Sequence, residues 1–170
     1  MTAPDLNVLQ QWFQCVDTDG SGLLDAKELR QALDIGGLSY TLAQVHLLVR
    51  AFDSKGNQKL DLNEFVELHR FLDAVQTCFS HFARGGSRLS AADAQQALIH
   101  MGHRLDGTVM RAVLDRYDTD TRGTFGVEDF LRMCLFLRTA ARAFQAFDTG
   151  KRGTVQLSLN QLCYAASYLA

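Results

Sequence analysis

Proline, net charge and long apolar runs are what this sequence of 170 residues has least of. Its single proline, Pro4, leaves almost the whole chain free of the residue that interrupts helices. A formal net charge of −2 provides no basic field for nucleic acid and no polybasic strip for anionic membranes. No apolar run is long enough to span a bilayer, and we expect no signal peptide. These absences predict an all-α globular protein of the cytoplasm.

Cysteine and enzyme motifs are scarce as well. The four cysteines lie far apart in apolar stretches, at Cys15, Cys78, Cys134 and Cys163. This spacing does not indicate a disulfide framework, and we interpret all four as reduced core residues. Nucleophile elbow, phosphate-binding loop and HExxH motif are all missing. Cys78 with His81, and likewise His100 with His103, would supply only half of a zinc site. We therefore predict no catalytic residue and no enzyme activity.

What the sequence does have is an acidic stretch, DTDGSGLLDAKE, from Asp17 to Glu28. One loop can supply the oxygen ligands of Ca²⁺ from positions 1, 3, 5, 7, 9 and 12, with glycine at position 6. These ligand positions hold Asp17, Asp19, Ser21, Leu23 through its carbonyl, Asp25 and Glu28. Gly22 occupies the turn, and apolar residues at helical spacing flank the loop on both sides. A solvated acidic loop would not explain this spacing, so we predict a helix–loop–helix calcium site.

Related loops recur along the chain, as expected because one such hand cannot bury its own apolar face. The second loop, residues 53–64, has lysine at position 3 and Gln58 instead of the turn glycine, so we expect weak binding. The fourth, residues 118–129, has Arg122 at position 5 and the short Asp129 at position 12, which favours Mg²⁺. The ligands of these two weak sites would be Asp53, Asn57, Lys59, Asp61 and Glu64, and Asp118, Asp120, Thr124 and Asp129.

Two further loops are expected to bind no metal. The third, residues 83–93, is one residue short and carries two arginines, and the fifth, residues 148–159, has Leu159 at position 12. Between the loops, residues 65–82 and 130–147 repeat apolar side chains at helical period without a breaker. Each of these segments is therefore predicted to be one long helix shared by two hands.

The order of the hands predicts how they pair. A two-residue strand at loop positions 7 to 9 needs a partner for its backbone groups, so the first hand pairs with the second and the third with the fourth. The fifth hand is left over in a single domain, residues 6–170, that follows a short tail, residues 1–5. We predict dimerisation through this hand, with a hand folded back on its own chain as the alternative. The predicted interface consists of Thr154, Val155, Gln156, Leu159, Leu162, Cys163, Ala166 and Leu169.

Five hands with these alternating gaps, and the phrases WFQCVDTDGSGLLDAKELRQAL and ALIHMGHRL, resemble the penta-EF-hand family. The resemblance runs from about Leu6 to Leu169, and the first hand is most similar to the family's branch of apoptosis-linked calcium adaptors and peflins. It implies a cytosolic homodimer or heterodimer that exposes an apolar groove to partner peptides, or associates with membranes, when calcium binds. The third hand departs from the family, where it is a principal calcium site, so calcium control should come mainly from the N-terminal pair.

Three hypotheses for function follow from this resemblance. The first is a calcium-dependent adaptor, in which closure of Glu28 onto the ion moves the first exit helix and uncovers apolar surface. The second is a regulatory subunit of a calpain-like enzyme, whose fifth hand pairs with a similar hand on a catalytic chain. The third is a structural dimer with little calcium response.

Overall fold

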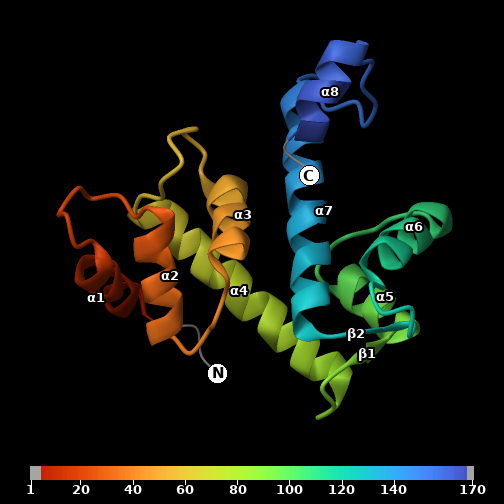
Figure 1. Ribbon diagram of the computed structural model, residues 1–170. Coiled ribbons are helices and arrows are strands. Elements are labelled where there is room, and N and C mark those ends of the chain that lie inside the picture. Colours follow the sequence, from red (N-terminus) through yellow and green to blue (C-terminus); the bar gives the residue numbers. More distant parts are fainter. Residues whose placement is uncertain (1–4, 168–170) are drawn as a thin grey trace. The chain divides into compact units, whose positions relative to one another are not determined.

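The computed structural model describes residues 5–167, which form helices and two very short strands (Figure 1). In chain order the elements are α1 (Leu6–Val16), α2 (Ala26–Ile35), α3 (Leu42–Phe52), α4 (Leu62–Ala83), β1 (Leu89–Ser90), α5 (Ala91–His100), α6 (Gly107–Tyr117), β2 (Thr124–Phe125), α7 (Val127–Phe147) and α8 (Leu159–Ser167). The predicted all-α class, with five helix–loop–helix hands, is confirmed. Of the described helices, none combines the length and the apolar character needed to cross a membrane.

The chain divides into two units, Met1–Ala74 and Val75–Ala170. The boundary falls within α4, so the first unit holds the first two hands and the second unit holds the other three. A single domain over residues 6–170 stays a prediction. The same is true of the tail over residues 1–5, of which only Asp5 is described.

The two long shared helices are confirmed as α4 and α7. They include the predicted segments, residues 65–82 and 130–147, and begin slightly earlier. The reason is visible at α7, where the side chain of Asp129 accepts a hydrogen bond from the N–H of the N-cap residue Gly126 at 2.9 Å. The last loop residues thus already form the first turn of the exit helix, which ties each loop directly to the helix that follows it.

In the first unit, the core forms on the apolar faces that helical period predicts. The ring of Phe13 in α1 meets that of Phe65 in α4 edge-on, with 5.8 Å between centroids. The loops of the two hands join through Leu24 and Leu60, whose N–H groups donate to each other's carbonyls at 2.7 and 2.9 Å. Both leucine side chains are fully buried. This single bridge lies at the centre of the predicted ladder and fixes the first two loops side by side.

In the second unit, the third and fourth loops pair through β1 and β2. The strands are antiparallel, with Leu89 opposite Phe125 and Ser90 opposite Thr124. Leu89 and Phe125 are buried, so this ladder also anchors the loops to the core. By contrast, no residue of α8 is buried along its described length. The predicted pairing is therefore confirmed, with the fifth hand unpaired among the residues that the structure describes.

The cysteines correct one prediction. Cys78 and Cys134 are buried, and burial raises the pKa of both thiols. Cys15 and Cys163 are exposed, so their assignment to the core is wrong. Cys15 follows the buried Phe13 by two positions, and residues at that spacing point to opposite sides of a helix. Cys163 is exposed because nothing in the described chain covers α8.

Candidate metal centre

The first loop folds around the carboxylate of its first residue, Asp17. Asp17 accepts backbone hydrogen bonds from Ser21 and Gly22 at 3.0 and 2.8 Å. Gly20 and Gly22 have φ angles of +65° and +72°, a region that glycine adopts without strain. Hydrogen bonding with Ser21 lowers the pKa of Asp19, and Asp19 Oδ1 accepts the Ser21 N–H at 2.9 Å. The sequence DTDGSG therefore closes the loop around acidic side chains, with Asp19 held in its ionised form.

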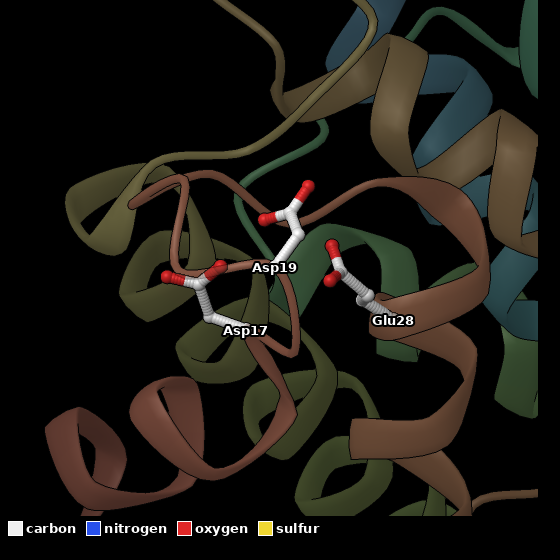
Figure 2. A group of neighbouring side chains, drawn as sticks. All are labelled: Asp17, Asp19 and Glu28. Atoms are coloured by element: carbon white, nitrogen blue, oxygen red, sulfur yellow. The ribbon is translucent and has the colours of Figure 1, made fainter.

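Three carboxylates gather in this loop. One oxygen from each of Asp17, Asp19 and Glu28 lies within 4.8 Å of the others (Figure 2). Glu28 is only 7% exposed, so solvent screens its charge poorly. Three negative charges at these distances repel one another unless a cation lies between them. In the described chain, residues 5–167, no other three histidine, cysteine, aspartate or glutamate side chains gather in this way.

The remaining predicted ligands of the first loop lie beside this cluster. The Ser21 hydroxyl donates to the Leu23 carbonyl at 3.0 Å. Asp25 has a second task as the N-cap of α2, where one carboxylate oxygen accepts the N–H groups of Lys27 and Glu28 at 2.7 and 3.0 Å. The donors are all hard oxygens, which fits Ca²⁺ and not a softer metal. The residues that would hold the ion are Asp17, Asp19, Ser21, Leu23 and Glu28, with Asp25 next to them.

Glu28 connects the loop to the exit helix. Its Oε1 accepts hydrogen bonds from the N–H and the hydroxyl of Thr18 at 3.0 and 2.9 Å. Its Oε2 accepts the N–H of Asp25 at 3.1 Å, which completes a capping box. Because Glu28 belongs to the first turn of α2, one carboxylate joins the start of the loop to the start of the helix. The capping box is visible in the D-x-x-E spacing, but the contact with Thr18, ten residues back, was missed.

The second loop carries its own cation. Lys55 Nζ lies 2.7 Å from Asp61 Oδ2, and this ion pair raises the pKa of Lys55 and lowers that of Asp61. Glu64 accepts hydrogen bonds from the N–H and hydroxyl of Ser54, as its counterpart does in the first hand. The predicted ligands lie along this one loop, at Asp53, Asn57, Lys59, Asp61 and Glu64. Their carboxylates, all within the described chain, do not gather into a cluster like that of the first loop.

The turn of the second loop is strained at one residue. Gln58 stands at the position of the turn glycine with a φ of +60°. A side chain in this region costs about 1 kcal/mol or more, partly offset because glycine loses more entropy on folding. Gln58→Gly should therefore raise the free energy of unfolding by about 0.5–1 kcal/mol. Trp12, the chain's one tryptophan, lies in the first unit and reports its urea unfolding by fluorescence.

The matched control for this prediction is Gly56→Ala in the same loop. Gly56 has a φ of +72°, and a Cβ atom there would meet nothing within 4 Å, so only backbone strain changes. This variant should lower the unfolding free energy by about 1 kcal/mol. If both substitutions change the free energy of unfolding in the same direction, the strain assigned to Gln58 is contradicted.

The fourth loop has the same backbone fold as the first loop but not its cluster of carboxylates. Asp118 accepts backbone N–H groups in the way the first residue of the first loop does. The carboxylate of Asp129 is turned to the start of α7, where it accepts a backbone N–H at 2.9 Å. Asp120 and Thr124 contact Arg88 of the third loop instead of one another. The four predicted ligands therefore lie in one loop, but the carboxylates of Asp118, Asp120 and Asp129, all within the described chain, do not gather as those of the first loop do.

The fifth hand retains the loop fold without ligands. Asp148 accepts the N–H groups of Arg152 and Gly153, both at 2.8 Å. Leu159 and Leu162 on α8 are 74% and 54% exposed. Of the other predicted interface residues, Val155 is partly buried and Leu169 lies outside the described residues. The remaining four are exposed, namely Thr154, Gln156, Cys163 and Ala166.

Paired helix–loop–helix hands with an oxygen-only acidic loop define the class of EF-hand calcium-binding proteins. In agreement, a family model described as an EF-hand domain pair matches residues 6–70. Sorcin from Schistosoma japonicum is 32% identical over 164 residues, which cover 95% of this chain and 95% of sorcin. Together with the five hands, this similarity shows that the chain belongs to the penta-EF-hand family.

Other relatives agree with this assignment. Peflin from Xenopus laevis is 31% identical over 86% of this chain, and the chain spans 53% of that peflin. A solved structure of a homolog of programmed cell death 6 protein from Leishmania major Friedlin matches with a TM-score of 0.63 and 26% identity. The match covers 95% of this chain and 94% of that structure. The predicted family, the fold and Ca²⁺ as the bound metal are thus confirmed.

Proposed function

We propose that the chain is a calcium sensor and adaptor, in which the first hand responds to calcium and partner proteins bind the apolar surface that this response uncovers. The supporting observation is the placement of Glu28, which belongs both to the acidic cluster and to the first turn of α2. Bound calcium supplies the double positive charge that offsets the repulsion among the three carboxylates.

The position of α2 depends on where the Glu28 carboxylate points. In the described conformation this carboxylate is held by Thr18 and Asp25. When it closes further onto a bound ion, it gives up these hydrogen bonds, and the first turn of α2 moves with it. The face of α2 that packs in the core carries apolar side chains, namely Ala26, Leu29, Ala32 and Leu33. Displacement of the helix therefore uncovers apolar surface for partner proteins or peptides.

The second part of the proposal is dimerisation through the fifth hand. The described part of α8, Leu159–Ser167, is only 9 residues long and has no buried residue. Helices shorter than about 12 residues are marginally stable in water without packing. A second chain with the same unpaired hand, or another penta-EF-hand chain, would cover its apolar side chains. We propose a cytoplasmic homodimer or heterodimer, with membrane association in the calcium-bound state.

The sensor proposal is tested by amide hydrogen exchange of the full chain in calcium and in chelator. Calcium should change exchange by at least about tenfold at the start of α2 and in the apolar segments of the first unit. Exchange in the third and fourth hands should stay unchanged. No change anywhere would favour a structural dimer. An aggregating monomer would favour a regulatory subunit that needs another chain.

A further inference from the structure

Arg88, in the third loop, donates hydrogen bonds to oxygen atoms at the ligand positions of the fourth loop. Its Nη2 donates to Asp120 Oδ2 at 3.0 Å and also to the carbonyl oxygen of Thr124. Its Nε donates to the Thr124 hydroxyl at 2.8 Å. One guanidinium thus holds three oxygens of a neighbouring hand. The contact spans the short ladder between β1 and β2, which fixes the two loops next to each other.

These oxygens belong to the positions at which an EF-hand loop coordinates calcium. Asp120 is at position 3 of its loop, and the Thr124 carbonyl is at position 7. In the first hand the same positions are Asp19 and Leu23. A guanidinium is always charged, and its planar set of donors matches several oxygen acceptors at once. Arg88 therefore supplies both the charge and the oxygen contacts that a metal ion would supply.

We propose that Arg88 is the built-in cation of the fourth hand, which keeps the paired third and fourth loops folded without calcium and prevents calcium from binding there. This holds whether or not the first hand acts as a sensor. The proposal also gives the arginine-rich third loop a role, because the side chain of Arg88 takes the place of a metal ion in the fourth loop. The C-terminal pair is then a constant scaffold, and the calcium response is confined to the first unit.

The first pair of hands shows the same arrangement in a weaker form. Lys59, at position 7 of the second loop, directs its Nζ toward Asp19 at position 3 of the first loop. The separation from Asp19 Oδ2 is 3.9 Å, too long for a hydrogen bond. An ammonium is a single point charge and cannot hold several oxygens as a guanidinium does. The first loop therefore keeps its carboxylates available to calcium, whereas the fourth does not.

A second arginine, within the fourth loop itself, plays a smaller part. Arg122 Nε lies 3.6 Å from Asp120 Oδ2, and the Arg122 side chain is 72% exposed, against 36% for Arg88. Removal of Arg122 alone leaves Arg88 in place. In a variant that lacks only Arg88, however, Arg122 could take over the contact with Asp120. The test therefore uses Arg122→Ser, which introduces the residue type found at position 5 of the first loop, with and without Arg88→Gln.

The experiment measures calcium binding and thermal unfolding of the full chain carrying Glu28→Gln, which silences the first hand. Arg88→Gln with Arg122→Ser should show new binding heat in millimolar Mg²⁺ and an unfolding midpoint that rises with calcium. Its apparent affinity should exceed that of Arg122→Ser alone by at least about tenfold. The matched control is Arg84→Gln with Arg122→Ser, because Arg84 is 81% exposed and its removal changes the net charge equally. This control should behave like Arg122→Ser alone.

Each outcome decides the proposal. A folded double variant without new binding, or an equal gain from Arg122→Ser alone, would overturn it. If the double variant does not fold in chelator, recovery of the helical signal in calcium supports the proposal, and no recovery overturns it. Calcium binding at the first hand is measured separately on the parent chain, so failure here leaves the sensor proposal untouched.

Discussion

Glu28→Gln should weaken calcium binding at the first hand by about a hundredfold or more, because it removes a coordinating charge from a buried position. Glu28 is one of the three carboxylates that gather within 4.8 Å and is buried in the core. A glutamine keeps the shape and one carbonyl oxygen but loses the negative charge. The measurement is a calorimetric titration of the full chain with calcium, at physiological salt and in millimolar Mg²⁺.

The fold should survive this substitution. The glutamine carbonyl can still accept the hydrogen bonds from Thr18, whereas its NH2 group cannot accept the N–H of Asp25, so only this one capping contact is lost. Far-UV circular dichroism should therefore match that of the parent chain. The control is Glu128→Gln, an exposed residue that carries the same charge and lies outside every loop ligand position. Unchanged micromolar binding after Glu28→Gln would contradict the assignment of the first hand as the calcium site.

The local parts of the fold could be predicted because they depend on spacing alone. Helical period located α4 and α7, and loop position 8 located the bridge between Leu24 and Leu60. Turn chemistry predicted the strained Gln58, since a loop with a fixed backbone demands a left-handed residue at position 6. The helices and the turn are set within a few residues of the chain, and the bridge joins equivalent positions of two successive loops, so the sequence contains enough information to place them.

The parts that could not be predicted depend on side chains that meet across loops. Arg88 and Asp120 are 32 positions apart, and the pairing of the two loops does not say which side chain reaches over it. The contact of Thr18 with Glu28 likewise joins two ends of one loop, and the spacing does not say which side chain meets Glu28 there. Cys15 shows a different limit, because an apolar neighbourhood in sequence does not say which helix face is buried. The candidate site was thus predicted in its ligands but not in the groups that hold or replace them.

The exposed fifth hand leads to the second prediction of large effect. Leu159→Asp combined with Leu162→Asp should convert a dimer into a monomer. These leucines are the most exposed large apolar residues of α8 apart from Tyr164. Two carboxylates from each chain, buried in an interface without partners, should cost about 3 kcal/mol or more, which raises the dimer dissociation constant by at least about a hundredfold. Sedimentation equilibrium should then give the mass of one chain instead of two.

The double substitution should leave the first unit and its calcium site unchanged, since neither leucine lies in that unit. Calcium titration of the monomer should therefore still show binding at the first hand. The matched control is Val109→Asp, which places a carboxylate on another apolar side chain, 43% exposed, on α6. That variant should remain a dimer, because the predicted interface does not include α6. A parent chain that is already monomeric at tens of micromolar would contradict the dimer proposal. A dimer that persists in the double variant would show that the interface lies elsewhere than on α8.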